Sequence, residues 1–480
     1  MQYPLARWTA LGLMLAGLVT VAACIEDSDS DDDRTGEVRV VHAISDVRSV
    51  DVAVDGQALQ PLRQIAYGDS SGLISLDAGE VEITVGPSGG GDEGTLDLEG
   101  LEQPVEIVED ERHVLVLSHR EEAGPYAQFL TEEIPEEAGQ ETGTVHYRVG
   151  HYSPIAPEEL DFYIIEDGES LDDSTEPVAT VAYDGLGEAG WSEAQEFQQD
   201  DFNLIVTEAG ADPTDPEQQL FRHQFDQSEA GLLEGELVLF AAMDTRRSTS
   251  PIDVTVVREA AGEPFLGLLD ERSGLRVLHG FLDEDDPDGD GAIDIDLDDA
   301  PGLITGLAPG ETSTTRPVEH GERVLDALYS SDGGHVLSDE ELELLESEDV
   351  LVIVAGNASS GTTELIRRGM PFSPLAGDQG RFHFTHAAPA YDMSQDSDLE
   401  LHFADDEEVI ADELEPGDGA IFNIVAGEFE AEVRNEGDDL LASREIEIHA
   451  GVLYNVTAVD GEDGGIELIV DELPVNPALD

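Results

Sequence analysis

The side chains that could do chemistry recur in four copies along the chain. At each copy a histidine ends a short run of β-branched or aromatic residues, and the four are His42, His151, His279 and His386. An acid opens a second apolar run 9 to 15 residues after each histidine. A metal site needs three or four ligands, and no second histidine accompanies these four consistently. We therefore expect each imidazole to hydrogen-bond a neighbouring loop and pin it, with a metal or ligand site as the less favoured interpretation.

The sharpest local motif is an acidic loop just after the third of these histidines. Its acids are Asp286, Asp288, Asp290 and Asp294, and a glycine stands at the sixth position. This spacing of oxygen ligands resembles a calcium-binding loop. Position twelve, however, is Leu297 rather than a bidentate glutamate, and no helical pattern flanks the loop. The motif predicts either a calcium ion that rigidifies this repeat or a solvated acidic loop.

A serine in the first repeat has the spacing of a hydrolase nucleophile. Residues 68–72 read Gly-Asp-Ser-Ser-Gly, which matches the nucleophile elbow with Ser70 at its centre. That elbow requires a strand followed by a helix, whereas the residues after Gly72 alternate as a strand does. A serine hydrolase is therefore an unfavoured alternative, and the pattern as a whole predicts no enzyme.

The amino terminus has the layout of an export signal. One arginine precedes a mostly apolar stretch that is too short to span a bilayer comfortably and ends in small residues. Residues 21–24, Val-Ala-Ala-Cys, resemble the bacterial lipobox, and Cys24 is the single cysteine of the chain. The resemblance implies cleavage after residue 23, lipid attachment at Cys24 and, because residue 25 is not aspartate, an outer-membrane lipoprotein. Acyl chains at Cys24 would then anchor the chain to a membrane.

The composition is strongly acidic. The chain has 110 acidic and 21 basic residues, a net charge of −89, and every basic residue is arginine. Such a charge repels itself in dilute buffer, and molar salt screens that repulsion because the Debye length falls to about 3 Å. The composition is typical of a halophile surface in contact with brine. It argues against nucleic acid as a partner.

The four histidines also mark an internal repeat. They are 109, 128 and 107 residues apart, which suits one small β-sandwich per repeat. Alternating apolar runs and frequent glycine turns predict an all-β fold of tandem immunoglobulin-like antiparallel β-sandwiches in an extended arrangement. One helix is expected at residues 338–347 from a capping-box spacing. The expected segments are a signal peptide at 1–23, an acidic tether at 24–36, and sandwiches at 37–135, 143–260, 273–369 and 380–474.

The first repeat resembles a known family. The residues that carry the resemblance are Val-Arg-Val-Val-His-Ala at 38–43, Val-Asp-Val-Ala-Val-Asp-Gly at 50–56, Ile-Ala-Tyr-Gly-Asp at 65–69 and Ala-Gly at 78–79. They are similar to DUF4397, a β-rich module of exported bacterial proteins without an assigned function. The second and fourth repeats keep parts of the pattern, and the third departs most. The resemblance implies no mechanism.

These observations favour a non-enzymatic, lipid-anchored module of the cell envelope that binds another envelope protein or a glycan, or serves a structural role. A calcium-dependent adhesion or matrix protein is the alternative. The position of the chain is expected to be periplasmic or surface-facing.

Overall fold

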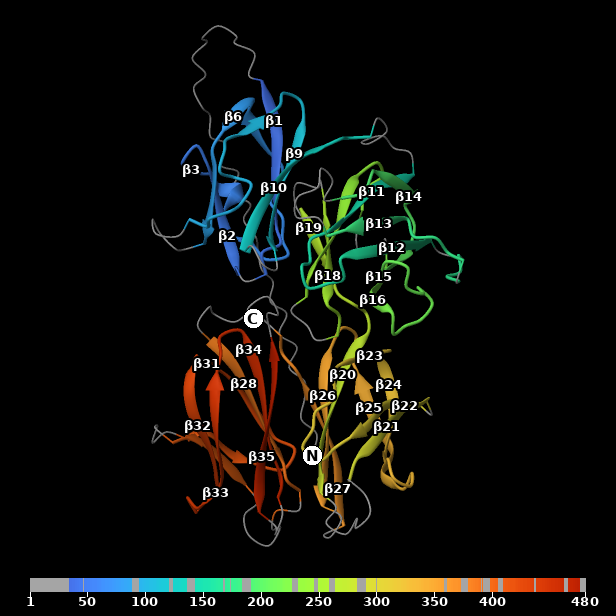
Figure 1. Cartoon of the computed structure of the whole chain (residues 1–480), viewed down its shortest axis with the longest axis vertical. Coiled ribbons are helices and arrows are strands. Elements are labelled where there is room, and N and C mark those ends of the chain that lie inside the picture. Colours follow the sequence, from blue (N-terminus) through green and yellow to red (C-terminus); the bar gives the residue numbers. More distant parts are fainter. Residues whose placement is uncertain are drawn as a thin grey trace, which may run out of the picture.

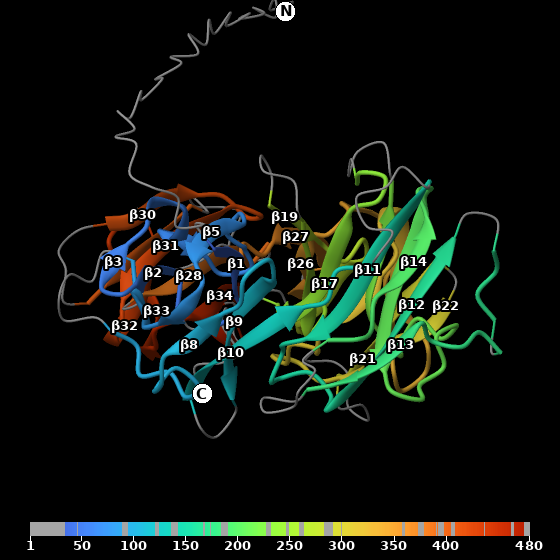
Figure 2. The same ribbon diagram turned by 90° about the horizontal axis from the view of Figure 1, so that it is seen from above.

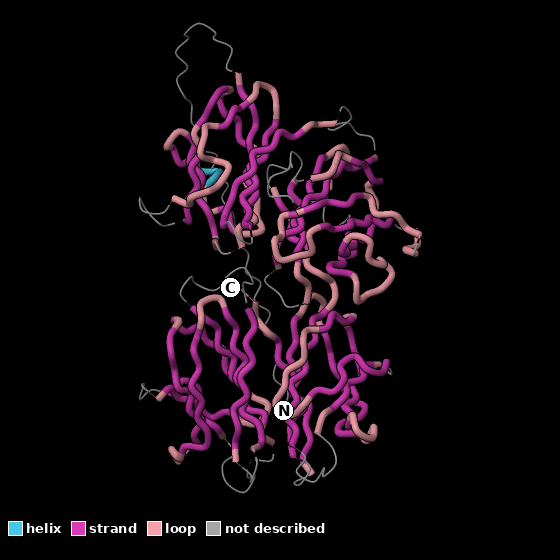
Figure 3. The backbone as a smooth tube through the Cα atoms, in the orientation of Figure 1, coloured by secondary structure: helices cyan, strands magenta, loops and turns pink. Residues whose placement is uncertain are grey.

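The chain folds almost entirely into β-strands (Figures 1 and 3). The computed structural model describes residues 34–474 apart from positions 46, 173, 299, 390 and 436 and segments 89–94, 121–123, 136–142, 167–168, 184–190, 227–231, 246–248, 259–263, 283–290, 358–360, 373–378, 392–397, 405–408 and 462–464. Within these residues, no helix has the length and hydrophobicity needed to span a bilayer. The predicted all-β class is confirmed.

The strands follow one another in four groups. The first group is β1 (Thr35–His42), β2 (Ser49–Val54), β3 (Gln57–Ala58), the 3-10 turn η1 (Gln60–Leu62), β4 (Ile65–Ala66), β5 (Ile74–Asp77), β6 (Gly79–Val81), β7 (Ile83–Pro87), β8 (Val105–Ile107), β9 (Arg112–Arg120) and β10 (Gly124–Glu132). The second is β11 (Thr144–His151), β12 (Glu159–Glu166), β13 (Ala179–Ala182), β14 (Gln195–Gln198), β15 (Phe202–Glu208), β16 (Gln219–Phe225), β17 (Leu237–Asp244), β18 (Ile252–Val257) and β19 (Phe265–Leu268).

The last two groups are the most regular. The third is β20 (Ser273–Leu282), β21 (Ile293–Leu297), β22 (Ala300–Leu307), β23 (Arg316–Val318), β24 (Gly321–Tyr329), β25 (His335–Leu344), β26 (Asp349–Asn357) and β27 (Thr362–Gly369). The fourth is β28 (Gln379–Ala387), β29 (Leu399–Phe403), β30 (Val409–Leu414), β31 (Gly419–Val425), β32 (Gly427–Asn435), β33 (Leu440–Ile448), β34 (Val452–Asp460) and β35 (Ile466–Pro474).

Each group forms a sandwich built around two main sheets, with an added two-stranded sheet, β6-β8, in the first and a fifth strand, β19, in one sheet of the second. In the fourth, one sheet has the order β31-β28-β34-β35 and the other β30-β29-β32-β33, and the third sandwich repeats this order with its own strands. The first strand of every sandwich pairs in parallel with a later one, as β1–β9, β11–β17, β20–β26 and β28–β34, while the other ladders between named strands are antiparallel. A crossover between the two sheets separates the parallel strands, so the alternating pattern could not reveal this pair. Tandem sandwiches are thus present, each with one parallel ladder in an otherwise antiparallel fold.

Every sandwich encloses its own apolar core between its two sheets. The cores of the first to fourth sandwiches are clusters of buried aliphatic and aromatic side chains, with Phe162, Phe202 and Phe240 among the buried side chains of the second. Burial of such side chains is the main stabilising contribution in a β-sandwich.

The sandwiches are joined in pairs, and the expected extended arrangement is wrong. An apolar cluster joins the first two: Val41, Val114 and Val116 of the first contact Leu239 and Met243 of the second. A second cluster joins the third and fourth sandwiches in the same way. Figures 1 and 2 show the two pairs stacked, with the chain turning back on itself. In both pairs the sheet that carries the parallel ladder packs against its counterpart, because both of its faces are apolar.

A helix is expected at residues 338–347, but residues 338–344 belong to strand β25 and a turn follows, so that prediction is wrong. β25 pairs antiparallel with β24, and Leu342 and Leu344 are buried while Glu341 and Glu343 are exposed. Alternate burial in a hairpin outweighs a local capping-box spacing, since tertiary packing overrides weak helix propensity. Strand β19 is a further difference: it pairs with β18 although the sequence placed residues 261–272 between repeats.

Candidate functional site

The four recurrent histidines lie at or near the end of the first strand of each sandwich and are all buried. The Nε2 atom of His42 lies 2.9 Å from the carbonyl oxygen of Val47, and that of His151 lies 2.9 Å from the carbonyl oxygen of Pro157. His279 repeats this contact at 2.8 Å with the carbonyl of Gly291. In all four copies Nδ1 lies 3.3–3.4 Å from the backbone N–H two residues onward. The first strand and the following loop are thereby tied through one imidazole.

These contacts define the protonation state of the ring. A carbonyl can only accept, so Nε2 of His42, His151 and His279 must carry the proton, and Nδ1 must accept from the backbone N–H. A neutral ring bonded in this way has no lone pair left for a metal ion. Across the residues that the structure describes, no group of three or more histidine, cysteine, aspartate or glutamate side chains is placed to hold one.

Acidification is expected to destabilise the fold through His151. Burial lowers the pKa of this ring from 6.5 to about 4, against a smaller opposing effect of its bond to Pro157. Between these values the unfolded chain binds a proton that the folded chain does not, so the free energy of unfolding falls as the pH drops from about 6.5 to 4. The loss is roughly 3 kcal/mol when complete. Urea unfolding of the wild type and His151→Gln between pH 7 and 4 would measure it, and equal pH dependence in both proteins would contradict the role of His151.

The other predicted site residues are only partly described. Cys24, Asp286, Asp288 and Asp290 lie outside the described residues. Asp294 lies on β21, where one carboxylate oxygen accepts hydrogen bonds from the backbone N–H of Gly306 and from the Ser330 hydroxyl, at 2.7 and 2.6 Å. These bonds hold the neighbouring strand β22 and the turn after β24.

Ser70 is a contact between the first two sandwiches. It is buried, and its hydroxyl donates a 2.9 Å hydrogen bond to the carbonyl of Pro264 in the second sandwich. The next residue, Ser71, accepts a bond from the backbone N–H of Val40, and Ser192 and Ser313 do the same in the second and third sandwiches. This repeated serine was missed in the sequence, although it follows a glycine by two or three positions in each copy.

A repeated arginine was missed as well. Arg39, Arg148 and Arg276 each stand three positions before the histidine of their repeat, on the opposite face of the same strand, and each is buried. The Arg39 guanidinium makes two bonds to Glu132, at 2.6 and 2.8 Å, and Arg276 pairs with Asp471 of the fourth sandwich at 2.8 Å. Arginine suits such positions because its planar fork can satisfy several acceptors at once. The sequence feature that could have revealed this arginine is its constant position, three residues before the histidine, in a chain with few basic residues.

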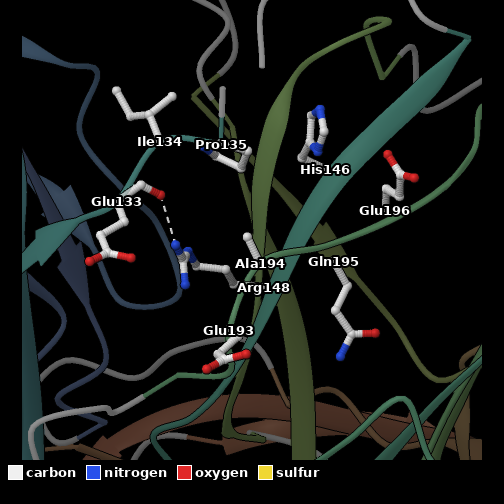
Figure 4. Close-up of a pocket in the computed structure, with 9 residues that line it drawn as sticks. All are labelled: Glu133, Ile134, Pro135, His146, Arg148, Glu193, Ala194, Gln195 and Glu196. Atoms are coloured by element: carbon white, nitrogen blue, oxygen red, sulfur yellow. Dashed lines mark hydrogen bonds between the residues drawn. The ribbon is translucent and has the colours of Figure 1, made fainter. Parts of the chain in front are cut away.

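A pocket of about 510 Å³ opens where the chain passes from the first sandwich to the second (Figure 4). Its lining residues are Glu133, Ile134 and Pro135 after β10, His146 and Arg148 on β11, Glu193 and Ala194 just before β14, and Gln195 and Glu196 at its start. His146 and Arg148 are two positions apart on one strand, so both point to the same face of the sheet. Both are buried, while the three glutamates around them are exposed.

The two buried side chains of the pocket differ in how they are held. Arg148 donates to the carbonyl of Glu133 at 2.7 Å, the dashed line in Figure 4, and to the carbonyl of Ser192 at 2.9 Å. Its guanidinium also lies 5.6 Å from the ring centroid of Trp191. Nε2 of His146, in contrast, has no hydrogen-bond partner among the described residues, nor has Nε of Arg148. A buried polar atom without a partner is costly, so both atoms raise the free energy of this part of the fold.

The electrostatics of the pocket restrict what can bind. Three carboxylates, those of Glu133, Glu193 and Glu196, surround one guanidinium, so the pocket disfavours anions. Gln195 is already bonded to the Tyr147 hydroxyl and to the carbonyl of Val178. The arrangement can accept hydrogen bonds from a hydroxyl or an ammonium group, and it contains no nucleophile beside a base.

Comparison with known proteins identifies one family. Residues 36–163 match the model of DUF4397, a domain of unknown function, which confirms the resemblance found in the first repeat. The match covers the first sandwich and reaches into β12 of the second. No curated protein sequence matches the chain.

Several solved structures are weakly similar to this chain. The TIE protein of Bacillus anthracis is 9% identical, with 88% of this chain and 68% of that one covered and a TM-score of 0.15. A leucine-rich repeat protein of Bacteroides thetaiotaomicron is 13% identical, with 43% and 26% covered and a TM-score of 0.12. A candidate cell adhesion protein of Bacteroides uniformis is 11% identical, with 69% and 98% covered and a TM-score of 0.15. Scores this low support no argument about function.

Proposed function

We propose that the chain is a non-enzymatic binding module of the cell envelope, tethered to the outer membrane through a lipid on Cys24. The observation that carries the proposal is the pocket at the junction of the first two sandwiches. Its floor is formed by the buried side chains of His146 and Arg148, and its rim is polar. Binding sites are commonly concave and lie where two domains meet.

The surroundings of the pocket favour recognition over catalysis. The first two sandwiches are held together by the apolar cluster and by hydrogen bonds such as that from the Thr255 hydroxyl to the carbonyl of Gly68, at 2.8 Å. The walls of the pocket are therefore fixed before a ligand arrives, which reduces the entropy lost on binding. The ligand class is a neutral or cationic group of an envelope glycan or protein, because the glutamates of the rim repel anions.

Photo-crosslinking from the rim of the pocket tests the proposal. A photoreactive amino acid at Ile134, which is 46% exposed, is expected to give a discrete adduct in the membrane fraction of living cells. The same group at Leu440, 54% exposed in the fourth sandwich, is the matched control and is expected to give none. Adducts of equal yield from both positions, or none from Ile134, would exclude the pocket as the binding site.

A further inference from the structure

The four sandwiches place a strand at the same sheet edge, and one of these strands differs from the rest. The edge strands next to the first strand of each sandwich are β5, β14, β23 and β31. The first three contain four, four and three residues, and each contains a charged side chain: Asp77, Glu196 and Arg316. β31 contains seven residues, Gly-Ala-Ile-Phe-Asn-Ile-Val, and no charge at all.

Short length and charge are the usual protections of a sheet edge against pairing with another chain. β31 lacks both, in a chain with 110 acidic residues. It pairs with β28 at seven consecutive positions without a bulge, so its backbone is straight enough to accept a further strand. In the part of the chain that the structure describes, β28 is its sole ladder partner. Figure 1 shows β31 at the outer edge of the fourth sandwich, and Arg368 of the third sandwich donates to the carbonyl of Gly417 just before it.

Apart from Asn423, which accepts a hydrogen bond from Arg381 at 3.0 Å, the larger side chains on both faces of β31 are apolar and incompletely covered. Ile421 and Val425 point outward and are 51% and 55% exposed. On the other face, Phe422 and Ile424 pack against the core of the sandwich but remain half-buried. Phe422 stacks on Phe382 with ring centroids 5.1 Å apart, so this side of the core ends at the sheet edge. An added strand would cover apolar surface on both faces.

The charges beside β31 indicate which strand can be added. The exposed Asp418 and Glu415 precede it, with Arg368 of the third sandwich beside Asp418, and the exposed Glu428 follows it. Antiparallel pairing with a second copy of this chain would bring the acids before one β31 close to those after the other, which is repulsive. A strand with basic residues at both ends would meet opposite charges instead. We propose that β31 is a docking edge for an extended segment of a partner protein, uncharged in its centre and flanked by lysine or arginine, which adds as an outer strand of the sheet.

The probe is a synthetic peptide in which valine and threonine alternate over the length of β31, with arginines at each end. Fluorescence anisotropy with the folded four-sandwich protein is expected to show saturable binding. A peptide with proline at its centre is expected to bind at least about tenfold more weakly, because proline cannot donate to a β-ladder. A peptide flanked by glutamates is expected to bind more weakly at low salt.

Two protein variants locate the contact. Ile421→Lys places a charge on the exposed face of β31 and is expected to weaken binding by about tenfold or more. Leu440→Lys is the matched control: it has similar exposure on β33, an edge strand of the other sheet that already contains charges, and it is expected to bind as the wild type does. Circular dichroism of both variants establishes that they fold.

Three results would overturn the proposal. Absence of saturable peptide binding, or equal binding by wild type and Ile421→Lys, would show that β31 does not accept the probe. Equal binding of the proline peptide would show that no ladder forms. Sedimentation of the wild type as a dimer that Ile421→Lys dissociates would assign the edge to a second copy of this chain.

Discussion

Replacing Arg272 by alanine is expected to lower the free energy of unfolding by about 3–5 kcal/mol, because it leaves a buried carboxylate without its partner. Arg272 and Asp270 lie between the second and third sandwiches, and both are 1% exposed. The guanidinium donates to both carboxylate oxygens of Asp270, at 2.9 and 2.6 Å. It also donates to the carbonyls of Pro216 and Gln219, at 2.9 and 3.0 Å, which lie in the second sandwich.

The third sandwich contacts the same joint. The Ser347 hydroxyl donates to the carbonyl of Asp270 at 2.5 Å, and Arg222 pairs with Glu271 and with Glu319 of the third sandwich. Loss of the Arg272 guanidinium therefore weakens the joint between the two pairs of sandwiches as well as the second sandwich itself. The expected effect is large because the contacts of Asp270, Glu271 and Arg272 with both sandwiches converge on one short segment.

Urea unfolding followed by circular dichroism measures the effect. Arg434→Ala, which removes a partly exposed arginine paired with Glu432 and Asp438, is the control and is expected to leave the midpoint unchanged. The double variant Asp270→Leu/Arg272→Met removes both charges and is expected to recover most of the loss, since apolar replacement of a buried pair is often neutral. A midpoint for Arg272→Ala equal to that of the wild type would refute the role of the pair.

The all-β fold class and the fourfold internal repeat could both be predicted from the sequence, because both depend on local patterns of residues. Alternating apolar residues identify half-buried strands, and the constant position of His42 and its counterparts reveals that the strands recur in four groups. The contacts of these histidines are also local: the imidazole of His42 reaches Val47, five residues onward. Patterns within about fifteen residues were therefore sufficient for the histidines.

The pairing of the sandwiches depends on contacts that no local pattern reports. Strands β17 and β26 are buried along their whole length, one face in their own core and the other against the neighbouring sandwich. Their continuous apolar runs are typical of strands covered on both faces. The apolar runs at residues 237–242 and 350–355 are visible in the sequence. An apolar run alone, however, does not identify which other part of the protein packs against it.

The pocket is hidden in the sequence for the same reason. Its floor comes from β11, and its walls come from Ile134 and from Glu193, which are about 60 residues apart in the chain. Only the joint between two sandwiches brings them together. The glutamates that line the pocket also give no sequence signal for a site, because acidic residues are common throughout the chain.

Replacing Glu132 by glutamine is expected to lower the free energy of unfolding by about 3–5 kcal/mol, because it leaves the buried Arg39 guanidinium uncompensated. The two side chains are each 1% exposed. Arg39 also donates to the carbonyl of Arg258 in the second sandwich at 3.3 Å, and Arg258 pairs with the buried Glu236. One row of alternating charges thus runs from the first sandwich to the second beneath their shared apolar cluster.

The control for Glu132 lies on the same sheet. Glu37→Gln removes a half-exposed carboxylate that pairs with Arg112 at 3.4 Å, and it is expected to cost less than about 1 kcal/mol because solvent screens exposed pairs. Trp191 fluorescence reports the interface directly, since this ring belongs to the apolar cluster between the two sandwiches. Glu132→Gln is expected to shift the Trp191 emission transition to lower urea, and Glu37→Gln is not. If the two variants behaved alike, the row of charges would contribute no more to the joint than an exposed ion pair does, and the apolar cluster alone would hold the first two sandwiches together.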